Sequence, residues 1–116
     1  MTKKDVLEDT YKFYSENPDQ VGYADGGCQY LTKEGNKCAL GRYMVDGRHQ
    51  EFNGGALSLF NFFDLKSILC EEVNHIDDVD FWIEVQSWHD KFALTKDPVY
   101  FKKRYGELLL KYGEES

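Results

Sequence analysis

The sequence lacks any long apolar run and any secretion signal. No stretch of its 116 residues approaches the roughly 18 consecutive apolar residues that cross a membrane. The first residues, MTKKDVLEDT, contain no apolar signal-peptide core. There are only three cysteines, and an odd number fits a reducing compartment better than a disulfide framework. We therefore expect a soluble cytoplasmic protein without a membrane partner.

Positive charge is also scarce. Lys and Arg total 14 against 21 Asp and Glu, a formal net charge of −7. Binding nucleic acid without sequence preference needs a basic stripe, so we expect no direct nucleic-acid partner. Seven acidic residues and no Lys or Arg lie between Glu71 and Asp90. This acidic block is either a solvated helix start and loop or a surface for a basic partner, as in an acidic nucleic-acid mimic.

Strong catalytic motifs are missing as well. The sequence has no nucleophile elbow, P-loop, Rossmann glycine fingerprint, HExxH or EF-hand pattern. An enzyme is therefore not the default interpretation. What the chain does contain is 41% hydrophobic and 16% aromatic residues. This composition predicts one domain, residues 1–116, with a core in which large aromatic side chains supply much of the buried area.

Residues 26–44 predict a β-hairpin over about residues 27–41. The segment from Thr32 to Asn36 has the chemistry of a three-residue hairpin loop, with Gly35 in the left-handed region. Because side chains alternate across a strand, four residues then share the buried face of the hairpin. These residues are Cys28, Tyr30, Cys38 and Leu40.

Helical periodicity predicts about four helices around this hairpin. They run from Lys3 to Ser15, from Ala56 to Val73, from Asp77 or Asp78 to about Leu94, and from Pro98 to Tyr112. The third helix has an apolar stripe at positions 81, 85, 88 and 92, and Asp97-Pro98 is a typical helix start. The expected fold class is α+β, one hairpin packed against roughly four helices.

Cys28 and Cys38 are candidate metal ligands, because the predicted register places them diagonally on one face. Zinc would need two further ligands, for which His89 and Asp90 are candidates. The nine-residue gap is longer than in structural zinc knuckles, and no CxxC occurs. Redox chemistry is another alternative, and buried free cysteines that pack as small apolar residues are the commoner case. The favoured interpretation therefore has no cofactor, with zinc as the alternative.

Gln86, His89 and Asp90 lie one turn apart on the third predicted helix. An imidazole beside a carboxylate suits a general base or an oriented ligand. The favoured interpretation is instead a partly buried histidine whose nitrogens are satisfied by backbone or hairpin groups, so that it pins the helix to the hairpin. Arg42, at the hairpin exit, is suited to clamp a phosphate or carboxylate, although a lone Arg more often forms a surface ion pair. Tyr30, on the cysteine face, completes the candidate ligand contacts.

Two segments resemble a known group. CQYLTKEGNKCALGRYM resembles a C-x-Y-x(n)-G-x-x-C-A-[IV]-G signature, and VQSWHD resembles an L-Q-x-x-H-D signature. Together they are similar to a group of small uncharacterised proteins of tailed phages and prophages. The matching positions are Cys28, Tyr30, Gly35, Cys38, Ala39, Leu40, Gly41, Gln86, His89 and Asp90. The chain departs from the group at Leu40 and Val85 and lacks the Pro-Asp pair that often follows the hairpin.

The resemblance implies that the hairpin and the His-Asp helix form one constellation, and by analogy that the protein modulates a host or inhibits its defence. Our first hypothesis is a phage-like accessory protein that binds a host protein or sequesters a small ligand, with self-association left open. The second is a metal-dependent or His-Asp enzyme acting on a phosphorylated or nucleotide substrate. The third is the acidic mimic.

Overall fold

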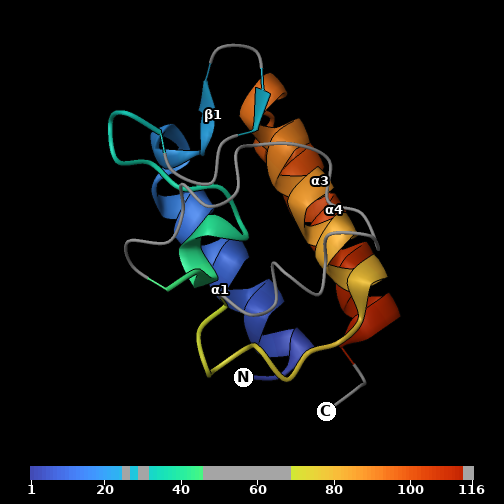
Figure 1. Ribbon diagram of the computed structural model, residues 1–116. Coiled ribbons are helices and arrows are strands. Elements are labelled where there is room, and N and C mark those ends of the chain that lie inside the picture. Colours follow the sequence, from blue (N-terminus) through green and yellow to red (C-terminus); the bar gives the residue numbers. More distant parts are fainter. Residues whose placement is uncertain (25–26, 29–31, 46–68, 114–116) are drawn as a thin grey trace.

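The computed structural model describes residues 1–24, 27–28, 32–45 and 69–113, with the backbone alone at residues 24, 27 and 28. Within these residues three α-helices dominate, as Figure 1 shows. They are α1 (Lys3–Glu16), α3 (Val79–Thr95) and α4 (Pro98–Tyr112). Two short 3₁₀ helices, η1 (Pro18–Gln20) and η2 (Gly41–Tyr43), lie in the connection that follows α1.

Each α-helix begins at a side-chain cap. The Thr2 hydroxyl accepts a hydrogen bond from the backbone N–H of Asp5, and the Asp5 carboxylate accepts one from the Thr2 N–H, which forms a capping box. Asp78 caps α3, and Asp97 caps α4 ahead of Pro98. These caps satisfy backbone N–H groups that have no partner within the helix, so they fix where the helices start.

Helix α4 packs against both α1 and α3. Aromatic side chains form much of this contact. Tyr11 of α1 stacks on Tyr105 of α4 with ring centroids 4.2 Å apart. From α3, Trp88 and Phe92 stack on Phe101 at 4.5 and 4.2 Å. Each such pair contributes about 0.5–1.5 kcal/mol beyond its buried area, so the stack joins the three helices into one unit.

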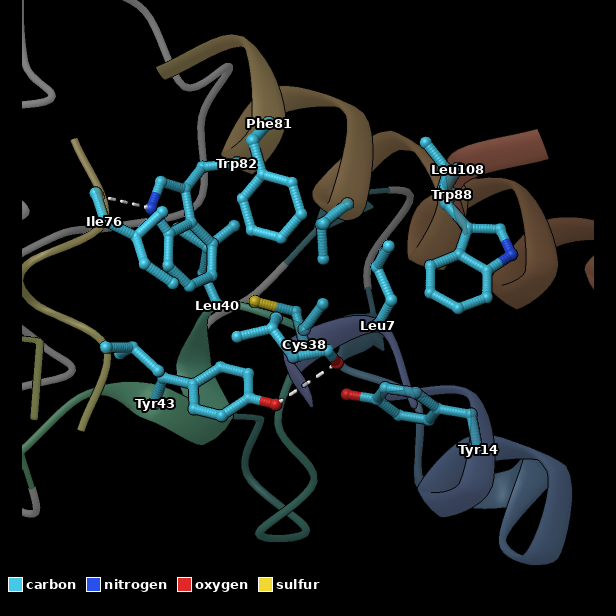
Figure 2. Close-up of a cluster of buried hydrophobic side chains, with 14 of the residues drawn as sticks. Leu7, Tyr14, Cys38, Leu40, Tyr43, Ile76, Phe81, Trp82, Trp88 and Leu108 are labelled. Atoms are coloured by element: carbon cyan, nitrogen blue, oxygen red, sulfur yellow. Dashed lines mark hydrogen bonds between the residues drawn. The ribbon is translucent and has the colours of Figure 1, made fainter. Parts of the chain in front are cut away.

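The core also takes in the segment before and within η2. Figure 2 shows Cys38 and Leu40 of this segment between side chains of α1 and α3, with Tyr43 beside them. The Trp82 indole N–H donates to the backbone oxygen of Ile76 at 3.1 Å, so its polar atom is satisfied inside the core. The labelled residues of the cluster are Leu7, Tyr14, Cys38, Leu40, Tyr43, Ile76, Phe81, Trp82, Trp88 and Leu108.

The predicted α+β fold with a hairpin over residues 27–41 is wrong. The described part of the chain is mostly helical, and it holds no strand longer than two residues. The strand β1 (Tyr23–Ala24) pairs antiparallel with β2 (Gly27–Cys28), so Cys28 pairs with Tyr23 rather than with the second strand of the predicted hairpin. The predicted loop itself is present, because Thr32 and Asn36 are hydrogen-bonded and Gly35 has φ +89°.

The hairpin fails because its second half turns into a helical segment. The Arg42 N–H donates to the oxygen of Cys38, and the Tyr43 N–H donates to the oxygen of Leu40. These carbonyl groups therefore serve turns rather than a strand ladder. The N–H of Leu40 is held by the Gln86 side chain of α3, a partner far away in the sequence.

The predictions for the other helices have mixed outcomes. The first, third and fourth predicted helices are confirmed as α1, α3 and α4. The helix expected from Ala56 to Val73 lies mostly outside the described residues. Its last part, Leu69–Val73, is a bridge to Met44 followed by turns rather than helix. None of the helices that the structure describes is both long and apolar enough to span a membrane.

Candidate functional site

Three side chains of α3 form a polar clasp, by which we mean Gln86, His89 and Asp90. His89 is fully buried, and its Nε2 accepts a hydrogen bond from the backbone N–H of Gly22 at 3.1 Å. Its Nδ1 lies 2.8 Å from Oδ1 of Asp90. A carboxylate oxygen accepts hydrogen bonds, so we assign the imidazole proton to Nδ1. Both ring nitrogens are thus engaged.

Gln86 holds the second segment of the clasp. Its Oε1 accepts from the backbone N–H of Leu40 at 3.2 Å, and its Nε2 donates to Oδ1 of Asp90, also at 3.2 Å. One carboxylate oxygen of Asp90 therefore orients both neighbours. The clasp ties the residue before β1 and the start of the η2 turn to the same helix face.

The geometry of the clasp favours a structural role. A general base or metal ligand needs a nitrogen lone pair that faces solvent, substrate or metal. In His89 the Nε2 lone pair faces the N–H of Gly22, and the ring is packed against Tyr14 with centroids 5.0 Å apart. The arrangement agrees with the favoured interpretation of a histidine with both nitrogens satisfied, although only Nε2 bonds to the backbone and Nδ1 bonds to the Asp90 side chain.

The structure describes only one of the two cysteines proposed as metal ligands. Cys38 is buried, and its Sγ accepts from the backbone N–H of Gly41 at 3.4 Å. The side chain of Cys28 lies outside the described residues, as does Tyr30. Among the described side chains no group of three His, Cys, Asp or Glu residues is placed to hold a metal. Zinc binding by Cys28 and Cys38 stays a prediction.

Arg42 lies in a different environment, with its guanidinium carbon 5.8 Å from the centroid of the Tyr14 ring. Its guanidinium stacks on the Phe13 ring, 4.1 Å from the centroid, and its Nη2 pairs with Oδ2 of Asp9 at 3.0 Å. The same Asp9 oxygen accepts from the Tyr43 hydroxyl at 2.6 Å. The stacking and the ion pair fix the plane of the guanidinium. Its Nη1 is buried and makes no hydrogen bond to the part of the chain that the structure describes.

Burial together with this hydrogen bond also affects Tyr43. Burial raises the pKa of the Tyr43 phenol, and the negative charge of Asp9 raises it further. The phenol is therefore neutral across the physiological range and acts as a hydrogen-bond donor. Asp9 thus carries the negative charge that balances Arg42 on the α1 side.

A pocket of about 260 Å³ lies beside Arg42. Among the described residues its lining combines two cations, two amides, one aromatic ring and a glycine, and it contains no carboxylate, imidazole, thiol or hydroxyl. These residues are Phe13, Gln20, Gly35, Asn36, Lys37 and Arg42. A cationic pocket in a chain of net charge −7 is suited to a small anion.

The structure separates Arg42 from the other described residues that the sequence proposed as ligand contacts. Arg42 lines the pocket, whereas the polar clasp does not. Sequence reasoning missed Gln20, Asn36 and Lys37, because an amide or a lysine in a loop carries no local signal of a site. One signal was available: the Gly35 turn was recognised, and Asn36 and Lys37 follow it directly.

The acidic block from Glu71 to Asp90 divides into two sets. Asp78 caps α3 and pairs with Lys3 at 3.0 Å, Glu84 pairs with Arg104 at 3.2 Å, and Asp90 belongs to the clasp. Glu71, Glu72, Asp77 and Asp80 are exposed. Part of the block therefore stabilises the fold and part of it faces solvent.

Comparison with known proteins adds no family. No protein-family model matches the chain, and no curated protein or solved structure is significantly similar to it. The structure does bring the two phage-like motifs into contact, through Leu40 of the first and Gln86 of the second. Membership of the phage and prophage group remains a prediction that rests on those motifs.

Proposed function

We propose that this protein binds a small anionic ligand in the pocket beside Arg42 and acts by holding the ligand rather than by transforming it. The observation that carries the proposal is the state of Arg42. Its guanidinium is fixed by Phe13 and Asp9 and lines a pocket, while Nη1 has no hydrogen-bond partner among the described residues. A guanidinium that is held in a fixed orientation at the wall of a pocket is suited to bind an anion there.

The lining supports binding rather than catalysis. The described lining residues supply positive charge and amide hydrogen bonds, and none of them forms a nucleophile–base pair. His89 and Asp90, the sequence candidates for acid–base chemistry, are engaged in the polar clasp. Sequestration of a small ligand was one arm of the first sequence hypothesis, and this geometry favours it over the metal-dependent or His-Asp enzyme.

The other arms stay predictions. Acidic mimicry would need a contiguous acidic surface, and binding to a host protein would be favoured by a contiguous apolar one. Among the described residues, four large apolar side chains are exposed, at separate positions in the sequence. These are Val45, Leu94, Val99 and Leu110. Apolar residues scattered singly over a surface are normal and do not indicate an interface.

A thermal-shift experiment tests the proposal. Phosphate, sulfate, acetate and citrate are compared with chloride at equal ionic strength, because a ligand that binds only the folded state raises Tm. We expect at least one of these anions to raise Tm in the native protein and not in Arg42→Gln. Arg104→Gln is the matched control, since Arg104 also pairs with a carboxylate, that of Glu84 on α3. NMR spectra of the stabilising anion after prolonged incubation should be unchanged.

The outcome against the proposal is equally clear. An equal response of the native protein and Arg42→Gln to every anion would contradict it. If Arg42→Gln fails to fold, Lys37→Gln replaces it, because Lys37 also lines the pocket and has no role in the Asp9 pair.

A further inference from the structure

We infer that the ligand of the Arg42 pocket is a phosphate monoester of a small polar molecule. The inference rests on the proposed function and names the chemical class of the ligand. It is carried by the pairing of two different cations with two amides in one small pocket.

The two cations favour a phosphate over a carboxylate. Arg42 has a planar guanidinium and Lys37 has a compact ammonium group, and both residues line the same pocket. A carboxylate has two oxygens that match one guanidinium fork. A phosphate monoester carries about −1.5 to −2 charge near pH 7 and three outer oxygens, so it accepts from both cations at once.

The pairing of Asp9 with Arg42 gives a second reason to prefer a phosphate ligand over a carboxylate. Asp9 pairs with Nη2 of Arg42 at 3.0 Å and so occupies one edge of the guanidinium with a carboxylate already. A second carboxylate would therefore meet only part of the fork. A tetrahedral dianion can accept a charge-assisted hydrogen bond from Lys37 in place of the one that the guanidinium edge paired with Asp9 cannot donate.

The two amides indicate what the phosphate is attached to. Gln20 and Asn36 side chains each carry a donor and an acceptor, which suits hydroxyl or carbonyl groups. Asn36 is held in place, because its backbone N–H donates to Oγ1 of Thr32 and its Nδ2 to the oxygen of Asp19. Gln20 closes η1, whose Pro18 oxygen accepts a hydrogen bond from Lys96. The Asn36 side chain, which is held before the ligand arrives, therefore loses less entropy on binding.

The size of the pocket limits the body of the ligand. Its volume of about 260 Å³ lies below the range of roughly 300–1,000 Å³ typical of pockets for drug-sized ligands. A sugar monophosphate or a nucleoside monophosphate is of this order, and both present a phosphate ester on a body with hydroxyl groups. The shared chemistry is the ester, and titration with both kinds identifies the body.

Isothermal titration at fixed ionic strength tests the inference. The probes are glucose 6-phosphate, adenosine 5′-monophosphate, glucose 6-sulfate, inorganic phosphate and succinate. Glucose 6-sulfate is the matched probe, because it keeps the body and the tetrahedral group but carries one charge. We expect at least one phosphate ester to bind about tenfold more tightly than glucose 6-sulfate, succinate or inorganic phosphate at pH 7.5. Because the second phosphate pKa is about 6, its advantage over glucose 6-sulfate should shrink at pH 5.5.

The protein variants separate the two cations. Lys37→Gln should weaken the phosphate ester about tenfold or more and leave glucose 6-sulfate within about threefold, because it removes the second charge-assisted hydrogen bond. Arg42→Gln should abolish binding of both, and Arg104→Gln should change neither.

The two possible failures are distinguishable. Succinate binding as tightly as the phosphate esters, in an Arg42-dependent way, would overturn the ligand class and leave the anion-binding function standing. Equal affinities for the phosphate and the sulfate, or insensitivity to Lys37→Gln, would overturn the class in the same way. No Arg42-dependent binding of any probe in either experiment would overturn both proposals.

Discussion

Gly22 donates its backbone N–H to Nε2 of His89 at 3.1 Å, although the two residues are 67 positions apart in the sequence. The imidazole is fully buried, and its other nitrogen is held by Asp90. This hydrogen bond fixes the chain just before β1 on α3. Because Gln20 of the pocket lies two residues before Gly22, the position of the pocket wall depends on this contact.

Replacing His89 tests the contribution of this contact. His89→Phe keeps a ring beside Tyr14 but leaves the buried N–H of Gly22 without an acceptor, which costs about 1–3 kcal/mol. Urea denaturation should therefore show a lower free energy of unfolding. Ser87→Ala, an exposed substitution on the same helix, is the control and should stay within about 0.5 kcal/mol of the native protein. Equal stability of both variants would contradict the role given to His89.

Gln86 should behave in a similar way and should be coupled to His89. Gln86→Leu leaves the N–H of Leu40 unsatisfied, which again costs about 1–3 kcal/mol. Both residues bond to the same Asp90 oxygen, so their effects should not add. A double-mutant cycle with His89→Phe measures the difference, and we expect a coupling of at least about 0.5 kcal/mol. Strict additivity would show that the clasp is not one unit.

Two glycines should respond to alanine in opposite directions. Gly106 lies in α4, and a methyl group there would meet no atom within 4 Å, so Gly106→Ala should stabilise the protein by about 0.5–1 kcal/mol. Gly35 also has open space, but its φ of +89° is strained for any L side chain. Gly35→Ala should therefore be destabilising by about 1 kcal/mol or more. Thermal unfolding of both variants measures these changes in stability. Stabilisation by Gly35→Ala would contradict the left-handed turn.

Acid should weaken the fold through Glu84 and Asp78. Burial alone would raise the pKa of Glu84, but the hydrogen bond from Tyr112 and the charges of Lys111 and Arg104 outweigh it and lower that pKa below 4.5. Burial is likewise outweighed at Asp78, where Lys3 and the N–H of Phe81 lower the pKa below 3.8. The unfolded chain thus takes up these protons at a higher pH than the folded chain. Their contribution is present above about pH 5 and is lost as the pH falls through the lowered values.

Urea titrations between pH 7 and pH 3 measure this loss. Glu84→Gln should be less stable than the native protein at pH 7, and the difference should shrink towards pH 3, because the native carboxylate takes up its proton as the pH falls through its lowered pKa. Both groups are partly exposed, so the effect at each is at most about 1 kcal/mol. Lys103→Gln, an exposed change on α4, is the control and should keep the native pH dependence. A constant difference between Glu84→Gln and the native protein at all pH values would contradict the assignment.

Much of the helical part was predictable from local signals. Asp97-Pro98 marks the start of α4, and the stripe of Phe81, Val85, Trp88 and Phe92 marks the buried face of α3. The Gly35 loop was recognised for the same reason, since a turn of five residues contains its own chemistry. Caps, helical spacing and turn residues all act over a few positions, so one sequence is sufficient to reveal them.

Of the residues that line the pocket, the sequence singled out only Arg42 as a ligand contact, and it did not predict how the site is assembled. Arg42 was chosen as an anion clamp, and Gln86, His89 and Asp90 were recognised as neighbours on one helix face. Nothing local indicated that Asp9 and Phe13 of α1 would fix the guanidinium of Arg42. The contact of Gln86 with Leu40 spans 46 positions, and a hairpin drawn from local pairing alone could not include it.

The sequence alone therefore determined the three described α-helices, the caps of α3 and α4, the buried face of α3 and the turn at Gly35. Tertiary structure decided the rest: the helical turn at residues 38–43 in place of a strand, the engagement of both His89 nitrogens, and the pocket in which Arg42 meets Lys37. The physical reason is the range of the forces. Helices and turns satisfy their backbone groups among near neighbours, whereas a loop takes its hydrogen bonds from whichever distant side chain the packing of helices brings to it.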